Sequence, residues 1–471
     1  MDALRASAPR RARLVLALAG WLAIGVADAD ERVHFGMFGD LHLARPSGAA
    51  DDVVLLVSGS DGWTARMQAM ADALAAAGTL AVGVDQPVYR ARLDALGEAC
   101  AYPAGHFEEM AHWIQRHEGI TDYRTPFVGG DGDGVALAYA FVGQAPAGTY
   151  AGLFTLGWDW NAAFTRPFCA GDAGTPSIRV AAGAFRVAPL ARFPVDWVAH
   201  PFAGSAHADA TVAALATTWR LFASLAPPLA ASDPGAEAAS AYAELRSRGQ
   251  STLAALPDDI ADLPLTEIAP GARDDGRIAL VLTGDGGWAG LDKGVAEVLA
   301  ADGMRVIGFS TLRFFWEKRT PEATVDAVRR VLAHYAGRYP QARFALVGYS
   351  FGASLVPHVL NHLPADLQQR IDGATMISPD DEAVFEIKIG DWFGGAHHQG
   401  ALPVLPEIER SRMPVTCIHG SEETDSFCAE AKSPRLLVRS LPGGHHYDGD
   451  YAALGRLIVE ALAAAPPDRP H

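Results

Sequence analysis

Residues 344–363 read FALVGYSFGASLVPHVLNHL. An apolar run ends in Gly348-x-Ser350-x-Gly352, and apolar residues at helical spacing follow it. Glycines at these positions remove the Cβ atoms that would collide where a strand turns abruptly into a helix. The pattern predicts a strand, a sharp turn and a helix, with the hydroxyl of Ser350 exposed as a nucleophile. Pro357, about two turns in, is expected to kink the helix or shift its start.

The segments around this turn alternate between strand and helix patterns. A helix is predicted at 293–301, and strands are predicted at 278–283, 304–309, 371–378, 414–419 and 436–441. Such alternation is typical of α/β domains with mainly parallel sheets. We therefore expect an α/β-hydrolase-like fold.

The first half of the chain repeats this pattern. Strands at 53–57 and 79–84 enclose a helix at 66–77, and both halves carry a Gly-Trp turn after their first strand. Where the second half has its nucleophile turn, the first half has Gly130-x-Gly132-x-Gly134, so that Gly132 replaces Ser350. No carboxylate stands where an orienting acid is needed. We predict a degenerate hydrolase-like domain that serves as a binding or packing module.

Composition and sequence patterns suggest four segments. Residues 1–29 hold four arginines, an apolar run at 14–26 and an Ala27-Asp28-Ala29 cleavage site, which is typical of a secretory signal peptide. The alternative, a membrane anchor, would need a run of about 20 apolar residues. The degenerate domain is expected at 30–225 and the catalytic domain at 266–471. Between them we expect a linker at 226–265, which contains one helix near 236–248.

The charge of the chain limits its partners. The 471 residues have 49% hydrophobic content and a formal net charge of −17. An acidic surface disfavours nucleic acid and anionic membranes, and it suits a substrate with a cationic group. We expect no nucleic-acid partner.

The four cysteines are expected to form two disulfides, one in each half of the chain. Cys100 is paired with Cys169, and Cys417 with Cys428, because an even count in an exported chain favours bridges. Zinc is the alternative, but no C-x-x-C or paired histidine spacing accompanies these residues. We therefore expect neither a metal nor a cofactor.

The remaining catalytic groups should follow the order serine, acid, histidine that this fold uses. A loop after the strand at 414–419 carries three carboxylates, Glu422, Glu423 and Asp425. We choose Asp425, with Glu423 as the reserve. After the last strand, two glycines precede His445 and His446, and we choose His445 as the base.

Other parts of the site are expected around the nucleophile. Backbone N–H groups of Phe351 and Gly286 would hold an oxyanion. The segment 380–412 is a long excursion between two strands and is either a substrate wall or a solvated surface loop. On the first interpretation Asp380, Asp381 and Trp392 contact the substrate.

These motifs resemble the bacterial virulence protein family that contains VirJ and AcvB. The resemblance is carried by GDGGW at 284–288, GYSFG at 348–352, DSFC at 425–428 and GGHHYDGD at 443–450. The two-copy chain is similar to the AcvB form, whereas shorter VirJ-type members match only the second half.

The resemblance implies a periplasmic serine hydrolase that cleaves lysyl-phosphatidylglycerol, an aminoacylated phospholipid in the outer leaflet of the inner membrane. An ester with a cationic acyl group fits a serine site in an acidic protein, and peripheral membrane contact is then expected. Two other hypotheses remain, a general periplasmic esterase or thioesterase and a non-catalytic virulence or secretion adaptor.

Overall fold

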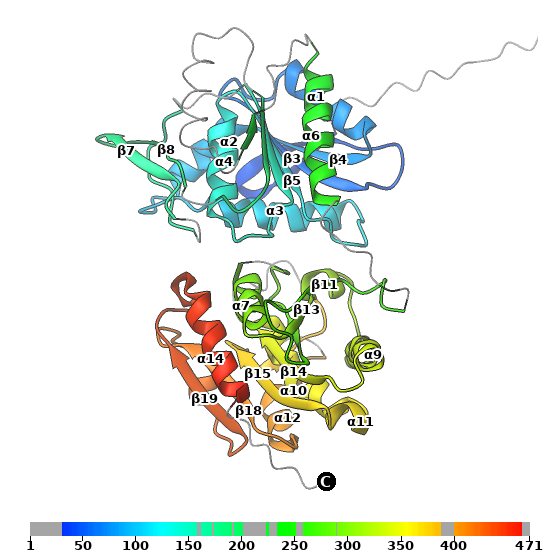
Figure 1. Cartoon of the computed structure of the whole chain (residues 1–471). Helices are drawn as coiled ribbons and strands as arrows, with labels where there is room; N and C mark the ends of the chain where they lie inside the picture. Colours follow the sequence, from blue (N-terminus) through cyan, green and yellow to red (C-terminus); the bar gives the residue numbers. More distant parts are fainter. Residues whose placement is uncertain are drawn as a thin grey trace, which may run out of the picture.

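The computed structural model describes residues 31–157, 162–171, 174–190, 193–200, 223–225, 233–250, 257, 259–288, 290–387 and 400–463. Two regions, each built on its own sheet, follow one another along the chain (Figure 1). The predicted signal peptide lies outside the described residues, as do Trp392 and the end of the chain. Among the helices that are described, none is long and apolar enough to cross a membrane.

The first region contains a mostly parallel eight-stranded sheet in the order β1-β2-β4-β3-β5-β6-β9-β10. Its strands are β1 (Glu31–Phe35), β2 (Gly39–Ala44), β3 (Asp52–Val57), β4 (Thr79–Val84), β5 (Phe127–Asp131), β6 (Gly152–Leu156), β9 (Trp197–His200) and β10 (Ala223–Leu225). Its helices are α1 (Ala65–Ala76), α2 (Gln86–Ala95), α3 (Pro103–His117), α4 (Gly134–Gln144) and α6 (Pro234–Gln250). A hairpin, β7 (Ser177–Ala181) and β8 (Ala184–Val187), stands apart from the sheet.

The second region contains a seven-stranded sheet in the order β11-β13-β12-β14-β15-β18-β19. Its strands are β11 (Leu265–Ile268), β12 (Arg277–Leu282), β13 (Arg305–Phe309), β14 (Arg343–Tyr349), β15 (Ile371–Ile377), β18 (Val415–Gly420) and β19 (Leu436–Leu441). Its helices are α7 (Gly290–Ala301), α8 (Thr311–Phe314), α9 (Pro321–Arg338), α10 (Phe351–His362), α11 (Ala365–Gln368), α12 (Val404–Arg410), α13 (Phe427–Glu430) and α14 (Tyr451–Ala463). Two short strands, β16 (Glu382–Ala383) and β17 (Leu402–Pro403), pair outside the sheet.

The expected pair of α/β domains with mainly parallel sheets is confirmed. Six strands of each sheet run in the same spatial order, β4-β3-β5-β6-β9-β10 in the first and β13-β12-β14-β15-β18-β19 in the second. The pairs along these strands are parallel, and antiparallel strands are added only beyond β4 and β13. Parallel sheets are covered by helices on both faces, which explains the unbroken apolar runs of β3 and β12.

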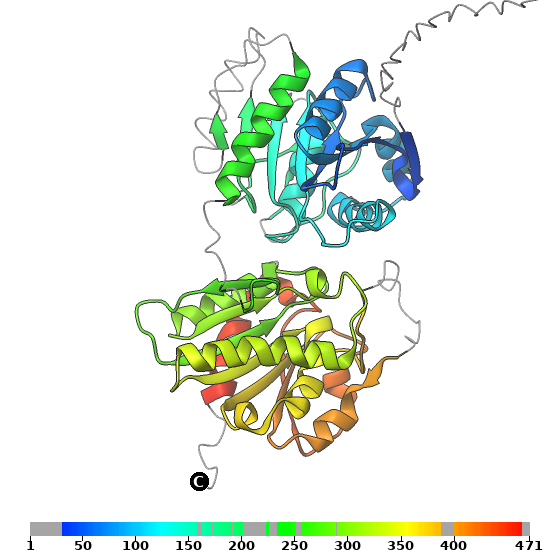
Figure 2. The same cartoon turned by 90° about the vertical axis from the view of Figure 1, so that its right-hand side faces the viewer.

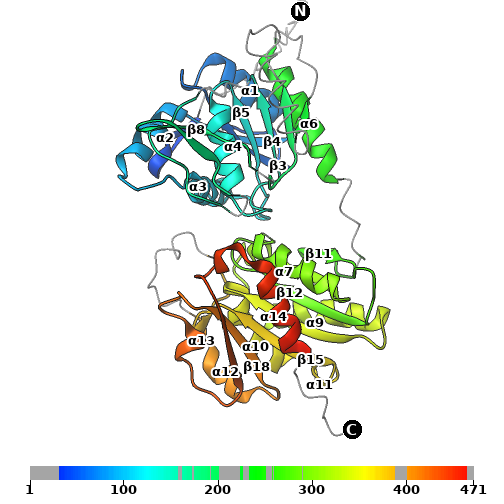
Figure 3. The same cartoon turned by 60° about the vertical axis from the view of Figure 1, so that its left-hand side comes forward.

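The core of the second domain shows how the sheet is buried on both faces. Ile278 and Leu280 pack with residues of α9, α10 and α12, whereas Ala279 and Val281 pack with residues of α7 and α14. The two helix layers are visible in the rotated views (Figure 2, Figure 3). This framework fixes the carboxyl ends of β12, β14, β18 and β19, where a site of this fold is built.

The helix expected in the linker belongs to the first domain. In α6, Tyr242 and Leu245 are buried against α1 and the sheet, and the Tyr242 hydroxyl donates to Asp52 Oδ2 at 2.7 Å. Helix α6 thus covers the first sheet as α14 covers the second. Residue 225 is therefore too early an end for the first domain, because the apolar face of α6 completes its core.

The two domains touch through polar and aromatic contacts. Trp316 Nε1 donates to the Ile120 carbonyl at 2.7 Å, and Arg313 Nη2 lies 3.2 Å from Asp122 Oδ2. Tyr123 of the first domain is buried within the core cluster of the second. In Figure 1, α3 lies on the side of the first domain that faces the second.

Both predicted disulfides are present. Cys100 is bonded to Cys169 in the first domain, and Cys417 to Cys428 in the second. The second bridge joins β18 to α13 across a sequence separation of 11 residues. It closes the loop that carries the candidate acids.

Candidate active site

The turn between β14 and α10 has the geometry that its sequence predicts. Ser350 sits at the tip with φ 49° and ψ −115°, a strained conformation for a residue with a side chain. A Cβ on Gly352 would lie 2.3 Å from the Thr283 carbonyl oxygen, and one on Gly348 would lie 2.5 Å from the Gly352 carbonyl oxygen. Both positions therefore require glycine. Helix α10 continues through Pro357 as far as His362.

Ser350 and His445 are brought into hydrogen-bonding contact. Ser350 Oγ lies 3.0 Å from His445 Nε2, across a sequence separation of 95 residues. His446, the second choice, instead places Nδ1 3.0 Å from the Tyr349 hydroxyl. A serine paired with an imidazole in this way can lose its proton as it attacks a carbonyl carbon.

The carboxylate that faces the base is Glu423, and the choice of Asp425 needs correction. Glu423 Oε1 is 4.0 Å from His445 Nδ1, and it accepts hydrogen bonds from Ser378 Oγ at 2.5 Å and from Gly420 N–H at 3.0 Å. Asp425 is exposed, two residues further along the loop. The physical reason is reach, because the chain turns back toward β18 at Glu423 and has moved to the surface by Asp425.

A small network that sequence reasoning missed holds Glu423 in place. Ser378, at the end of β15, lies 2.8 Å from the Tyr447 hydroxyl as well as donating to Glu423. Ser378 also has a positive φ of 45°. Its only signal in the sequence is its place as the last residue of a predicted strand. The Cys417–Cys428 bridge closes the same loop from its other side.

The surroundings of His445 favour its neutral, basic form. Burial lowers the pKa of His445, and the nearby charge of His446 lowers it further, whereas Glu423 and Asp285 act to raise it. A general base must be unprotonated to accept the serine proton. Because the pKa of His445 is lowered overall, His445 stays unprotonated, and can act as a base, at a lower pH than an ordinary histidine.

The glycine-rich loop after β12 lies against the nucleophile. A Cβ on Gly284 would be 3.8 Å from Ser350 Cβ, and the N–H of Phe351 opens helix α10 beside it. Burial raises the pKa of Asp285, while hydrogen bonds from the N–H groups of Asp285 and Gly286 oppose the shift. Phe351 thus keeps its expected place, whereas Gly286 would have to turn its N–H from Asp285 toward an oxyanion.

A cavity of about 680 Å³ opens over Ser350 and His445. Asp380 lines it, as the sequence led us to expect, whereas Asp381 is exposed and is not part of the lining. Trp392 falls outside the described residues. Trp288 packs on Gly308, where its ring atoms would meet an added Cβ at 2.2 Å.

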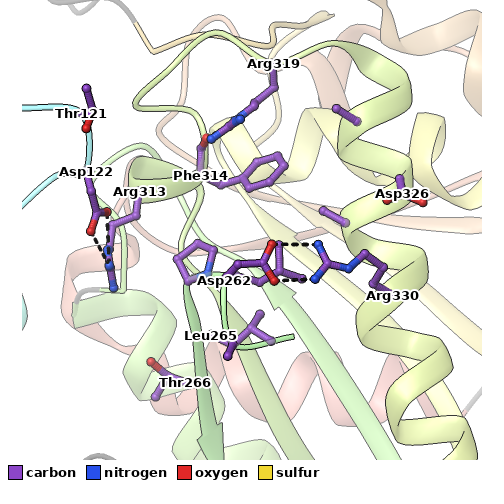
Figure 4. A pocket seen from close by; sticks show the side chains of 15 residues that line it. Thr121, Asp122, Asp262, Leu265, Thr266, Arg313, Phe314, Arg319, Asp326 and Arg330 are labelled. Atoms are coloured by element: carbon purple, nitrogen blue, oxygen red, sulfur yellow. Dashed lines mark hydrogen bonds and ion pairs between the residues drawn. The ribbon is translucent and has the colours of Figure 1, made fainter. Parts of the chain in front are cut away.

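A second cavity, of about 920 Å³, lies at the domain boundary away from the nucleophile (Figure 4). Four of its charged side chains form pairs within the lining, Arg330 with Asp262 and Arg313 with Asp122. Among the described residues that line it, neither Ser350 nor His445 is present. The cavity at Ser350 is therefore the candidate active-site cavity.

Among the side chains that the structure describes, one group could hold a metal ion. His358 and His362 of α10 and Glu407 of α12 place one ligand atom each within 4.8 Å of the others. Glu407 is already paired with Arg410, and it accepts a hydrogen bond from Asn361. These three residues do not line the cavity at Ser350.

The matching turn in the first domain keeps the backbone and lacks the nucleophile. Gly132 has φ 59°, close to the φ of Ser350, and a Cβ on Gly134 would lie 2.2 Å from the Ser58 carbonyl oxygen. Nearby, Arg66 pairs with Asp131 at 2.9 Å. With no hydroxyl at the tip, this turn cannot perform the same attack.

The family described as "Bacterial virulence protein (VirJ)" matches residues 276–465. Among curated proteins, no match to the chain was found. Similar solved structures include Est1E from Butyrivibrio proteoclasticus with ferulic acid bound, at 14% identity, TM-score 0.33 and coverage of 43% of this chain and 96% of that one. An alpha-beta serine hydrolase homologue from Coxiella burnetii has 14% identity, TM-score 0.30 and coverage of 42% and 89%.

We expect Glu423→Gln to lower kcat/KM for a chromogenic p-nitrophenyl ester by about a hundredfold or more, because the imidazole loses the charge that orients and stabilises it. Asp425→Asn is the matched control, and as an exposed substitution it should change kcat/KM by no more than about twofold. Steady-state kinetics of both variants decide the assignment. A large loss in Asp425→Asn with none in Glu423→Gln would reverse it.

The pH profile should report the environment of His445. The acidic limb of kcat/KM is expected below the ordinary histidine value of 6.5, since activity is lost only when falling pH protonates the base. Removing the Glu423 charge in Glu423→Gln should move this limb to lower pH, and His446→Gln should move it to higher pH. Both variants shifting the limb in the same direction would contradict this description.

Proposed function

Because residues 276–465 belong to the bacterial virulence protein (VirJ) family, we propose that this chain is a serine hydrolase that cleaves the aminoacyl ester of lysyl-phosphatidylglycerol. The products are lysine and phosphatidylglycerol. The observation that carries the proposal is the 3.0 Å contact between Ser350 Oγ and His445 Nε2 at a strained strand-to-helix turn. The substrate comes from the family resemblance, and the acidic cavity is compatible with it.

In the proposed reaction, His445 Nε2 takes the proton of Ser350 as the serine oxygen bonds to the lysyl carbonyl carbon. The N–H of Phe351 holds the oxyanion of the tetrahedral intermediate, together with the N–H of Gly286 once it has turned away from Asp285. The intermediate collapses, the bond to the glycerol oxygen breaks, and His445 gives its proton to that oxygen. Phosphatidylglycerol leaves, and lysine remains esterified to Ser350.

The second half of the reaction regenerates the enzyme. His445 takes a proton from water as the water oxygen bonds to the carbonyl carbon of the lysyl-serine ester. Collapse of this intermediate breaks the bond to Ser350 Oγ and returns the proton to it. Glu423 holds the imidazole and stabilises its charged form in both halves.

We further propose that the reaction takes place in the periplasm, where the lipid would be presented by the outer leaflet of the inner membrane. Two disulfides within the described chain support an oxidising compartment. The predicted signal peptide supports export. A peripheral contact with the membrane would bring the ester to the cavity.

The test is lysine release from liposomes that contain lysyl-phosphatidylglycerol. We expect release by the full chain and a loss of about a thousandfold or more in Ser350→Ala, because the nucleophile is gone. Ser440→Ala, an exposed serine on β19, is the matched control and should stay within about twofold. Lysine release at the wild-type rate by Ser350→Ala would contradict the mechanism.

A parallel assay separates the substrate from the chemistry. Alanyl-phosphatidylglycerol and a p-nitrophenyl ester are given to the same preparations. If the p-nitrophenyl ester is cleaved through Ser350 and neither lipid is, the chain is a general esterase and the lipid assignment is wrong. If Ser350→Ala alters none of the rates, the adaptor hypothesis takes precedence.

A further inference from the structure

The first domain forms one wall of the cavity that contains the nucleophile. Among the residues that line this cavity, five come from the first domain, namely Tyr102, Gly105, Glu108, Pro146 and Thr149. Three of them lie in or directly before α3, the helix that faces the second domain (Figure 1). A domain without a nucleophile thus contributes side chains to the reaction cavity of its neighbour.

Glu108 of α3 reaches the glycine-rich loop of the second domain. A Cβ on Gly286 would lie 3.9 Å from Glu108 Oε1, so the carboxylate sits directly above the loop that lies against Ser350. Glu108 is half-buried, and neither a hydrogen bond nor an ion pair joins its side chain to any other described residue. Without a partner in the protein, the carboxyl group of Glu108 is available to a group of the ligand.

On the side of the cavity at Ser350 the surroundings of Glu108 are acidic, whereas a smaller cavity that Glu108 also lines contains Lys293 and Arg313. The lining of the cavity at Ser350 includes Glu108, Asp285, Asp292, Asp380 and Glu386, and within the described lining no side chain is Lys or Arg. Arg116 offsets the charge of Glu386, which lies close enough to act to raise the pKa of Arg116. Glu108 faces Asp285 instead.

The pKa of Glu108 reflects this position. Burial and the charge of Asp285 raise the pKa of Glu108 to about 8. Glu108 in turn raises the pKa of two tyrosines that face it, Tyr123 and Tyr150, beyond the effect of their own burial. A positively charged group placed beside Glu108 would lower its pKa and bind to the ionised carboxylate.

We propose that Glu108 is a specificity-determining residue of the site, and that the first domain supplies it to bind an ammonium group of the aminoacyl part of the substrate. The inference rests on the proposed function for the identity of the aminoacyl group. An ammonium hydrogen-bonded to a carboxylate in a partly desolvated cavity is a strong, charge-assisted contact. The same negative lining repels a phosphate, so the lysyl end enters the cavity and the phosphoglycerol end stays outside.

The role also explains why the degenerate domain is positioned over the site. The turn at Gly132 has no nucleophile, while α3 packs against the second domain through Arg116, whose guanidinium lies over the ring of Trp316. The contribution of the first domain is then recognition rather than chemistry.

Binding measured without hydrolysis tests the inference on the full chain. In a Ser350→Ala background, calorimetry compares lysinamide, which carries ammonium groups, with N-acetylnorleucinamide, which has a similar chain length and no charge. We expect lysinamide to bind at least about tenfold more tightly, as a charge-assisted contact requires. Glu108→Gln should remove this preference, and Glu109→Gln, the adjacent residue outside the cavity lining, should keep it.

Each outcome decides the matter. A preference for lysinamide that persists in Glu108→Gln, or is absent from the starting protein, overturns the inference. Thermal denaturation reports whether Glu108→Gln has folded. Glu108→Asp keeps the carboxyl group but withdraws it by one methylene. This variant should lose less of the preference for lysinamide than Glu108→Gln does. Because no bond is cleaved, failure of lysine release from liposomes would refute the proposed function and leave this result standing.

Discussion

The abrupt turn at Ser350 is the constraint on which the rest of the structure depends. The start of α10 passes so close to the end of β12 that a single Cβ on Gly352 would overlap the carbonyl oxygen of Thr283. The turn can be held only because β12 and β14 are adjacent in a sheet that is packed on both faces. The strain at Ser350 is maintained by this core, and it leaves the hydroxyl pointing at His445.

The same turn in the first domain shows which part of the arrangement is structural. Gly134 makes the close approach that Gly352 makes, and Gly132 adopts the left-handed conformation of Ser350. The backbone is therefore preserved by packing alone, whereas the hydroxyl is needed only for chemistry. The first domain keeps the backbone of the turn and lacks the hydroxyl. It still presents a helix to the second domain, namely α3 with Glu108.

The sequence indicated the parts of the site that depend on local geometry. The glycine spacing predicts Ser350, and the two glycines before His445 predict a loop that returns an imidazole to the turn. The choice of Asp425 over Glu423 is wrong, because the position of the acid depends on where a loop turns relative to another strand. The helix α6 was placed in the linker because its partner surface on α1 lies far away in the sequence. Glu108 was missed for the same reason, since nothing local to α3 shows that it faces Gly286.

Covalent labelling shows whether Ser350 is an activated nucleophile. Incubation of the full chain with a fluorophosphonate, followed by peptide mass spectrometry, should find one phosphonyl group on Ser350. The label should be strongly reduced when His445 is replaced by glutamine, because the serine then lacks its base. Absence of any adduct, or an adduct on a different residue, would contradict the account.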